Sequence, residues 1–322
     1  MSSVHEFVAR VVDQPPWGAD DFRLVDVGAS GGIADRWNAF GDRLWAVGFD
    51  PLVAEIHRLA GIERRPKVHY DAAFVGWPHF DRVFPPDERA DLIKTRHVQP
   101  FPRLSAVGAQ RLMKQEYLDD YFRGQAPPDF LKIDTDGGDF LVLMGAERVL
   151  DDGVLGIQLE AMFHGAVHEY ANTFDNVDRY LRRRGFSLFE LTPYRYSRAD
   201  LPAPFVYDIP AQTTMGQVVW GEALYLRDLA HPSYDETFGY RSTPERVLKI
   251  CCLHALFDLH DCAAELLFRH PSLRDLADRR ALLDALTPGL FGRLSYEEYM
   301  SRFEADPTSF YPSRMRAVSS NR

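Results

Sequence analysis

Over its first 230 residues the chain alternates short apolar runs with amphipathic segments, and no other feature of the sequence limits the fold as strongly. Apolar runs of strand length that alternate with helix-like patterns are typical of βαβ units, which place parallel strands in one sheet and helices on both of its faces. We therefore expect an α/β fold with a sheet of seven mostly parallel strands. The expected strands are residues 22–28, 44–50, 67–73, 130–134, 154–160, 186–191 and 218–226.

Helical spacing of apolar residues marks two of the segments between these strands, 140–150 and 173–184. Gly185 follows the second segment, at a position where a glycine commonly ends a helix. A further helix is expected over 33–40, because this segment follows directly on the first strand and a turn of small residues.

The chain divides by composition into a central domain and two flanking parts. Residues 1–20 are expected to form an N-terminal helix or arm, 21–235 the α/β domain, and 236–322 a helical C-terminal extension. Within the domain, residues 76–105 carry several prolines and no sustained period. A connection of this length predicts a long loop that could serve as a lid over a site.

Two helix starts are marked in the C-terminal extension. Thr243 before Pro244 is the pattern of an N-cap followed by a first-turn proline, and Ser295 with Glu298 forms a capping box. We expect a small helical bundle that packs on the sheet domain or on a second subunit. A homo-oligomer formed through this tail is therefore an open alternative.

Charge and composition limit the partners. The formal net charge is −10, which disfavours duplex nucleic acid and anionic lipid surfaces as general partners. The sequence has no run of about 18 apolar residues. Its first residues also lack the apolar core of a secretion signal. We therefore expect a cytoplasmic protein without a membrane span.

The three cysteines, Cys251, Cys252 and Cys262, are clustered and odd in number, which fits a reducing compartment. His254 and His260 lie nearby and would be the partners of a zinc site. Buried thiols on a helix are the simpler interpretation, and it is the one we adopt.

The first expected strand runs into a turn of small residues, from Gly28 to Gly32. Small residues allow the backbone to approach a ligand closely, and the helix expected next would offer free N–H groups at its N-terminus. A dinucleotide fingerprint would need glycine at the positions of Ser30 and Ile33. Because neither is glycine, a dehydrogenase that uses a nicotinamide or flavin dinucleotide is disfavoured.

Asp26, two residues before Gly28, together with the small residues up to Gly32, resembles motif I of class I methyltransferases that use S-adenosylmethionine. Asp50 closes the second strand 22 residues after Gly28, where a carboxylate can accept hydrogen bonds from both ribose hydroxyls. Two alanines at the end of the third strand would leave room for the adenine ring. The cofactor-binding residues expected from this resemblance are Asp26, Gly28, Ala29, Ser30, Gly32, Asp50, Ala72 and Ala73.

Residues 129–140 read DFLKIDTDGGDF and are followed by Gly-Ala-Glu at 145–147. This run resembles the signature of the FkbM family of class I methyltransferases. The resemblance covers roughly residues 20–230 and implies a Rossmann-like fold. The chain departs from the family's pattern at Ser30, where asparagine is usual, and at Gly138-Asp139, where Ala-Glu is usual.

The resemblance implies an O-methyltransferase that transfers a methyl group from S-adenosylmethionine to a hydroxyl of a sugar, a glycan or a natural product. An alkyl alcohol is a poor nucleophile, so a base within hydrogen-bond reach should assist the displacement. The catalytic candidates at the carboxyl ends of the fourth and fifth strands are His164, Asp134 and Glu160, with Asp136 beside them. Histidine is the residue type whose ordinary pKa lies nearest neutral pH, which favours His164.

A metal-assisted variant of the reaction is an alternative. Asp134, Asp136 and Glu160 are hard oxygen donors that could hold Mg²⁺ and lower the pKa of the acceptor hydroxyl. Against it, Asp-x-Asp after a strand is often a helix-entry cap, here for a helix that begins near Gly138. We therefore assign no metal to the site. Lys132 is expected to form an ion pair and has no assigned role in catalysis.

A second function class is a catalytically silent scaffold that keeps the fold and docks a partner through the helical tail. For the enzyme, the expected partner is a small-molecule or glycan acceptor. Aromatic side chains near the expected cleft could stack on a sugar or an apolar ring, although most aromatic residues belong to cores. These candidates are Tyr70, Trp77, Phe101, Phe163, Tyr194 and Tyr196.

Overall fold

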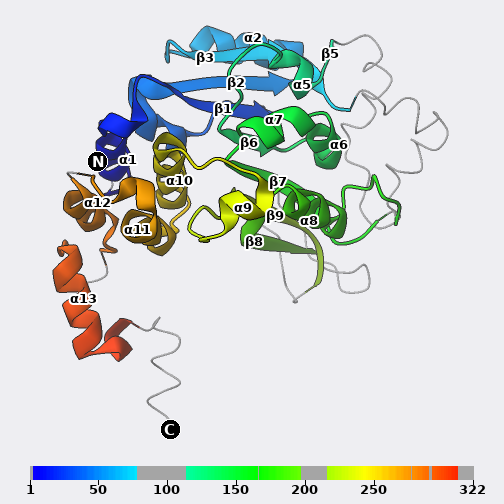
Figure 1. Cartoon of the computed structure of the whole chain (residues 1–322). Helices are drawn as coiled ribbons and strands as arrows, with labels where there is room; N and C mark the ends of the chain where they lie inside the picture. The colour runs from blue at the N-terminus through cyan, green and yellow to red at the C-terminus, as the bar shows by residue number, and fades with distance from the viewer. Residues whose placement is uncertain are drawn as a thin grey trace. The chain divides into compact units, whose positions relative to one another are not determined.

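The computed structural model describes residues 3–77, 114–165, 167–196, 216–276, 278–289 and 292–310 (Figure 1). The chain forms two compact units: Asp21–Trp37 with Asp42–Asp228, and Met1–Asp20 with Asn38–Gly41 and Leu229–Arg322. Most of the long loop expected over 76–105 lies outside the described residues, as does Phe101. Among the described residues, no helix has the length and apolar character needed to cross a membrane.

The first unit contains the seven-stranded sheet, in which the strand order is β3-β2-β1-β6-β7-β9-β8. β9 runs antiparallel to both of its neighbours, and the other pairings are parallel. The strands are β1 (Phe22–Val27), β2 (Leu44–Asp50), β3 (Val68–Ala72), β6 (Phe130–Ile133), β7 (Gly156–Met162), β8 (Phe186–Tyr196) and β9 (Gln217–Arg227). The predicted α/β fold is confirmed. The chain order reverses between β1 and β6, and open α/β sheets bind ligands at the carboxyl ends of the strands beside such a point.

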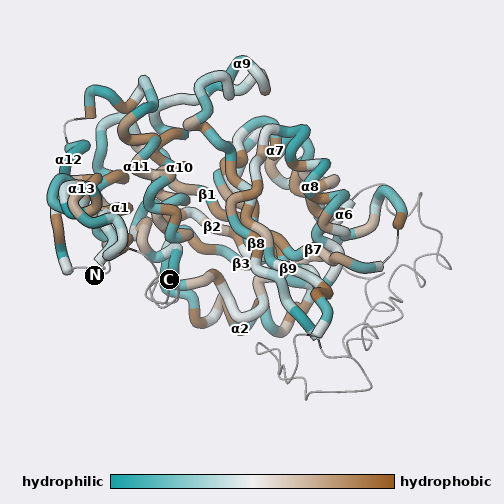
Figure 2. The backbone as a smooth tube through the Cα atoms, turned by 90° about the horizontal axis from the view of Figure 1, so that it is seen from below, coloured by the Kyte–Doolittle hydropathy of each residue, from teal (hydrophilic) through white to brown (hydrophobic). Residues whose placement is uncertain are grey.

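One face of this sheet is the main hydrophobic core. Alternate residues of the central strands, such as Val25, Val27, Ile133 and Leu159, are buried there. Four helices supply the other half of the core: α5 (Leu118–Tyr121), α6 (Asp139–Met144), α7 (Glu147–Asp152) and α8 (Phe174–Arg183). Figure 2 shows apolar colour concentrated in the strands and alternating with polar colour along these helices.

The helix predicted over 33–40 is not an α-helix. The chain forms 3₁₀ turns instead, η2 (Asp35–Arg43), which are interrupted at Gly41 by a positive φ of 53°. Trp37 explains part of this geometry, because its ring lies against Phe22 and Phe130, with ring centroids 5.7 and 5.0 Å away. The position of this segment after the strand and the turn does not by itself determine an α-helix.

The single helix predicted over 140–150 is two short helices, α6 and α7, separated at Gly145 and Ala146. A Cβ atom on Gly145 would lie 2.0 Å from the carbonyl oxygen of Gly76, so the two backbones approach closely at this point. The carbonyl of Gly145 accepts a hydrogen bond from Asp119 N. Contacts with distant segments therefore break the helix where a glycine permits it.

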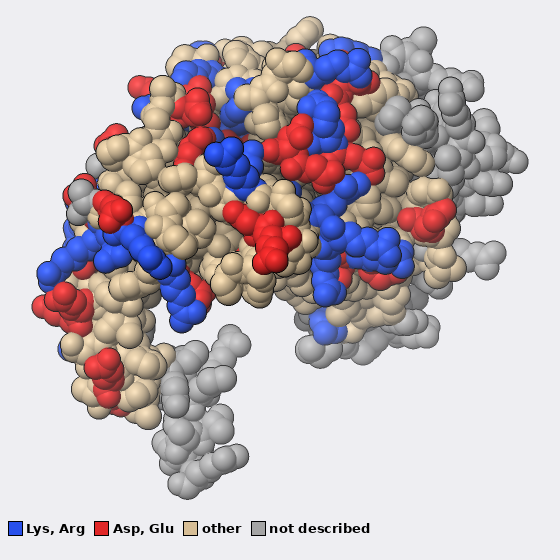
Figure 3. All heavy atoms as spheres, viewed as in Figure 1, with Lys and Arg blue, Asp and Glu red and all other residues tan. Residues whose placement is uncertain are grey.

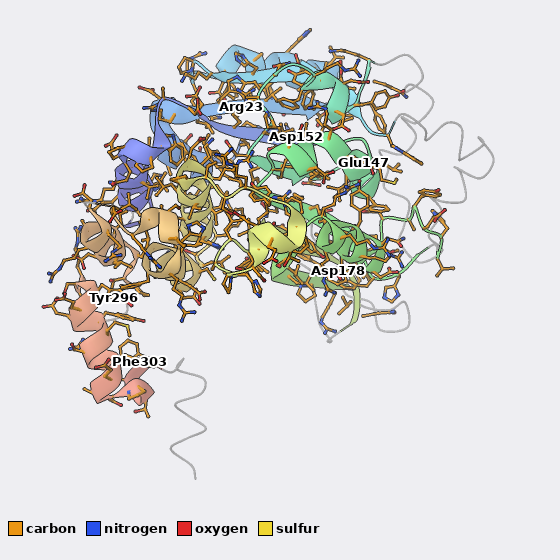
Figure 4. All side chains as sticks on the ribbon, in the orientation of Figure 1. Arg23, Glu147, Asp152, Asp178, Tyr296 and Phe303 are labelled. Atoms are coloured by element: carbon orange, nitrogen blue, oxygen red, sulfur yellow. The ribbon has the colours of Figure 1, made fainter. Side chains whose placement is uncertain are left out.

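Helix α8 and its end are as predicted. Gly185 has a φ of 86° and donates its N–H to Arg182 O, which closes the last turn. Arg184 forms ion pairs with Glu147 and Asp151 of α7, at 2.6 and 3.2 Å. Figure 3 shows basic and acidic side chains interleaved over the face that carries α7 and α8, and Figure 4 labels Glu147, Asp152 and Asp178 there. This face is a solvated network of ion pairs.

The second unit is helical. Its predicted caps are confirmed: Thr243 Oγ1 accepts from Arg246 N, and Ser295 and Glu298 form the capping box. Its helices are α1 (Ser3–Val12), α9 (Tyr234–Phe238), α10 (Pro244–Leu256), α11 (His260–Arg269), α12 (Arg279–Leu286) and α13 (Tyr296–Ala305).

The cysteines are thiols on helices of the second unit. Cys251 and Cys252 are buried in α10, and Cys262 of α11 is half-buried. Burial raises the pKa of both α10 thiols well above the ordinary value. They are therefore inert apolar groups at neutral pH, as the sequence predicted.

Arg227, at the end of β9, is a buried charged residue of the first unit. Its side chain is 2% exposed and donates to the carbonyl oxygens of Val154 at 2.7 Å, Leu150 at 2.6 Å and Arg184 at 3.0 Å. The guanidinium also lies 4.2 Å from the centre of the Phe186 ring. It joins α7, β7, β8 and β9 at one point.

We expect Arg227→Leu to lower the free energy of unfolding by about 3 kcal/mol, because three buried carbonyl groups lose a charged donor. Urea denaturation followed by circular dichroism measures the change. Arg182→Leu is the matched control, since exposed Arg182 forms an ion pair with Asp178 and its loss should leave the transition unchanged. An unchanged midpoint for Arg227→Leu would contradict this account.

Candidate functional site

The glycine-rich turn after β1 lies against the ends of β2 and β6. Gly28 has a φ of 83°, and a Cβ atom there would lie 1.8 Å from the carbonyl oxygen of Asp134. The N–H groups of Gly28 and Ala29 both donate to Phe49 O, at 2.8 and 2.9 Å. Only glycine allows the turn to adopt this conformation and approach β6 so closely.

The N–H groups of the turn are not free, contrary to the expectation from the sequence. Gly32 N donates to Ala29 O at 2.9 Å, Gly31 N to a carboxylate oxygen of Glu55 at 3.0 Å, and Ile33 N to the Tyr70 hydroxyl at 3.1 Å. The reason is that Ala29 O within the turn and two side chains from elsewhere in the chain, Glu55 and Tyr70, accept from these N–H groups. Ser30 is exposed and presents its hydroxyl at the tip.

Tyr70 supports this turn. A Cβ atom on Gly48 would lie 2.8 Å from the Tyr70 ring, so the missing side chain makes room for that ring. The Tyr70 hydroxyl donates to Glu63 Oε2 at 3.1 Å while it accepts from Ile33 N. Both hydrogen bonds support the turn, and stacking of the Tyr70 ring on an acceptor stays a prediction.

Asp50 ends β2 beside the turn, with its carboxylate 5% exposed. Its Oδ1 accepts from Leu52 N at 2.7 Å, which orients the carboxylate. At the end of β3, Ala73 is buried in the core, whereas Ala72 is half-buried. Of the two alanines, Ala72 therefore exposes more surface at the strand end.

Lys132 lies between the carboxylates of β1 and β6. Its Nζ is 3.1 Å from Asp26 Oδ1 and 3.3 Å from Asp134 Oδ2, and it donates to Gly28 O at 3.2 Å. Burial is the largest cause of the raised pKa of Asp26, about 6, and Lys132 opposes it. The ion pair expected for Lys132 is confirmed, and it ties Asp26 to the turn.

Two hydrogen bonds hold the backbone of Glu160, which lies near the end of β7. Asp139 Oδ2 accepts from Glu160 N at 2.9 Å, and Asn172 Nδ2 donates to Glu160 O at 3.1 Å. The other oxygen of Asp139 accepts from the N–H and hydroxyl of Thr135. Asp139 is therefore a buried link between the ends of β6 and β7, and the unusual Gly138-Asp139 pair makes no open surface for a substrate.

The carboxylate of Glu160 has a high affinity for a proton. Burial raises its pKa to about 8, with further contributions from the negative charges of Asp134, Asp139, Asp136 and Glu222. A carboxyl group with a pKa near neutral pH can both accept and release a proton during turnover.

The structure brings Asp134, Asp136 and Glu160 into electrostatic contact. Helix α6 has Gly138 at its N-cap and no side-chain cap, so the interpretation of Asp-x-Asp as a helix-entry cap is wrong. Asp136 has a φ of 55°, a conformation that aspartate tolerates better than most residues. Within the described parts of the chain, no group of three or more His, Cys, Asp or Glu side chains is placed to hold a metal ion.

His164 lies beyond the end of β7 and is exposed. Its Nε2 is 2.6 Å from Val218 O of β9, which makes this nitrogen the donor. The structure thus separates His164, bound to β9, from the carboxylates around Glu160.

Sequence reasoning missed three residues of this site: Asp139, Asn172 and Glu222. Glu222 of β9 lies directly opposite Glu160 of β7 and accepts from Gln158 Nε2. A carboxylate within the apolar run of residues 218–226 was the available signal for Glu222. Asn172 carried no such signal, because it follows β7 in an irregular segment.

A surface pocket of about 490 Å³ opens beside β3, and none of the predicted cofactor-binding residues lines it. Tyr70, Asp71 and Tyr121 are among its walls, and the Tyr121 hydroxyl donates to Asp71 at 2.9 Å. The pocket shares Tyr70 with the support of the turn, but neither Asp50 nor Glu160 lines it.

Residues 93–188 match the family model described as the Methyltransferase FkbM domain. This match includes the whole of the signature at 129–147 and confirms the resemblance that the sequence indicated. No curated protein is similar enough to this chain to match it.

Solved structures of methyltransferases are distantly similar to the chain. Methyltransferase FkbM from Methylobacillus flagellatus KT is 14% identical over 64% of this chain and 44% of that chain, with a TM-score of 0.35. Precorrin-6y C5,15-methyltransferase from Geobacter metallireducens GS-15 is 8% identical over 70% and 87%, with a TM-score of 0.32. Magnesium protoporphyrin IX methyltransferase from Synechocystis PCC 6803 is 8% identical over 70% and 81%, also at 0.32. The chain spans less than half of the Methylobacillus protein.

We expect Gly28→Ala to lower the free energy of unfolding by about 3 kcal/mol or more, because the methyl group would strain the backbone and strike Asp134 O. Gly31→Ala is the matched control: it has the same sign of φ, but no atom lies within 4 Å of the added Cβ. It should cost about 1 kcal/mol. Equal costs, measured by urea denaturation, would show that the close approach is not a constraint.

Proposed function

We propose that this protein is an S-adenosylmethionine-dependent O-methyltransferase that acts on a hydroxyl of a sugar, a glycan or a natural product. One observation supports the proposal above the others. The FkbM signature strand, β6, lies beside the glycine-rich turn of β1, at the point where the strand order reverses. The two motifs that are 100 residues apart in the sequence thus meet in one site.

The residues at the strand ends fit the cofactor. S-adenosylmethionine supplies a methyl group on a sulfonium centre, which a hydroxyl oxygen can attack. Asp50 offers a charged acceptor for a diol at the end of β2, and exposed Ser30 offers a hydroxyl beside it. Asp26, Gly28, Ala29 and Gly32 shape the turn, and half-buried Ala72 leaves space at the end of β3.

Glu160 is the residue best placed to take the proton of the acceptor. It lies near the carboxyl end of β7, and its backbone is fixed on both sides by Asp139 and Asn172. Its raised pKa makes the carboxylate a stronger base than an ordinary glutamate. Asp134 is paired with Lys132, and His164, beyond the carboxyl end of β7, is the alternative base.

The second candidate function is the silent scaffold that docks a partner through the tail. Helix α13 favours it, because none of its residues is buried and Phe303, labelled in Figure 4, is 42% exposed. The two functions differ in whether the protein transfers a methyl group from S-adenosylmethionine. A protein that binds S-adenosylmethionine and transfers its methyl group is not a silent scaffold.

Calorimetry with S-adenosylmethionine and S-adenosylhomocysteine tests the cofactor site. We expect Asp50→Asn to weaken binding about 10- to 100-fold, because the amide keeps the hydrogen bond from Leu52 N but loses the negative charge. Asp152→Asn, at an exposed position of α7, is the control, and this variant should bind the cofactor as the wild type does. No heat from the wild-type protein at high micromolar cofactor would refute the proposed function.

The pH dependence of methyl transfer tests Glu160. Only the deprotonated carboxylate can act as the base, so kcat/KM should rise about tenfold per pH unit and level off above a pH of about 8. The rate is measured with labelled methyl donor and a panel of hydroxylated acceptors. Glu160→Gln should lose most of the activity, and His164→Ala should retain this ascending limb. If His164→Ala loses the limb and Glu160→Gln keeps it, His164 is the base.

A further inference from the structure

Two rows of side chains cross β7, β9 and β8 at the end of the sheet where Glu160 lies. Directly opposed residues on neighbouring strands, and every second residue along a strand, share one face of a sheet. The first row is Glu160, Glu222 and Thr192, and the second is Met162, Trp220 and Tyr194. These six side chains, which include the proposed base Glu160, therefore belong to one face.

This face is open where the opposite face is covered. Leu159, Ala161 and Ala223 alternate with the residues of the two rows and are buried in the core against the helices. By contrast, Thr192 is exposed, and the other members of the rows are half-buried. Glu190, one step further along β8 on the same face, is also exposed.

Trp220 and Tyr194 form a rigid aromatic pair on this face. Their ring centroids are 3.9 Å apart and their planes differ by 11°, so the rings are stacked. The indole N–H of Trp220 donates to the Tyr196 hydroxyl at 3.0 Å, which fixes the orientation of the pair. A half-exposed stacked pair offers apolar surface at a low entropic cost of ordering.

The polar groups beside the pair include two carboxyl groups, of which Glu160, with a pKa of about 8, is mostly protonated at neutral pH and can donate a hydrogen bond. Ionised carboxylates accept hydrogen bonds from hydroxyls, and Glu222 is oriented by the amide of Gln158. The carboxylates of Asp134 and Asp136 add negative charge next to Glu160. An acceptor that carried its own negative charge would be repelled from this surface.

We propose that this face of β7, β9 and β8 is the acceptor-binding surface, and that it selects an uncharged saccharide ring over an anionic one. The ring would lie on Trp220 and Tyr194, with its hydroxyl groups directed to Glu222 and Glu160. The proposal rests on the proposed function, because it places the acceptor beside the residue that takes its proton. Aromatic surface with a few fixed polar groups is the usual composition of such sites.

Saturation-transfer NMR on the full chain, with excess S-adenosylhomocysteine, tests the proposal. The probes are methyl α-glucopyranoside and glucuronate, which share a ring and differ by one carboxylate. We expect transfer to the ring protons of the glucoside and at least about tenfold weaker binding of glucuronate. Trp220→Phe should weaken glucoside binding severalfold, since it keeps a ring but loses part of the stacking surface.

Glu222→Gln should narrow the difference between the two probes, because it removes one repulsive charge. Asp152→Asn is the control and should leave the difference unchanged, since Asp152 is exposed at the end of α7, one of the helices that cover the opposite face of the sheet. Equal binding of glucoside and glucuronate, no transfer to either probe, or no effect of Glu222→Gln would overturn the proposal.

Calorimetry on the same samples separates the two failures. If S-adenosylhomocysteine binds and neither probe shows transfer, the acceptor surface is wrong and the cofactor site stands. If the glucoside binds and S-adenosylhomocysteine does not, the surface binds saccharides, but the methyltransferase proposal and the acceptor role that rests on it both fail.

Discussion

The close approach of the β1 turn to β6 is the constraint on which the rest of the site depends. Gly28, with a positive φ, allows its backbone to contact the carbonyl of Asp134, and Phe49 O fixes the turn from the other side. A side chain at residue 28 would push the two strand ends apart. The turn, Asp50 and the carboxylates of β6 and β7 are neighbours because this one contact is possible.

Charge is the second organising factor. Lys132 pairs with Asp26 and Asp134, so these two carboxylates are partly neutralised within the sheet. Glu160 is half-buried among carboxylates, and the cost of removing its charge from water raises its pKa. The same sheet therefore holds paired carboxylates that support the turn and one carboxylate that is suited to proton transfer.

The strands could be predicted because their apolar runs are local and are bounded by turn residues. The helices expected over 33–40 and 140–150 did not form as predicted, because contacts with distant segments decide the backbone there. Trp37 packs on Phe22 and Phe130, and Gly145 lies close to the backbone of Gly76. The expectation of free N–H groups in the turn was wrong for the same reason, because Glu55 and Tyr70, which come from other elements, accept hydrogen bonds from them.

The sequence by itself determined the α/β class, the strand positions, the FkbM resemblance and the ionisable residues that stand at the strand ends, since each of these is written in a short stretch of chain. Only the tertiary structure decided how those residues are used. In the structure, Glu222 lies opposite Glu160, Asp139 is buried between the ends of two strands, and the His164 ring contacts a backbone carbonyl of β9. The physical reason is that register and burial arise from pairing between segments distant in sequence, and they set which carboxylate is paired, which is structural and which can accept a proton.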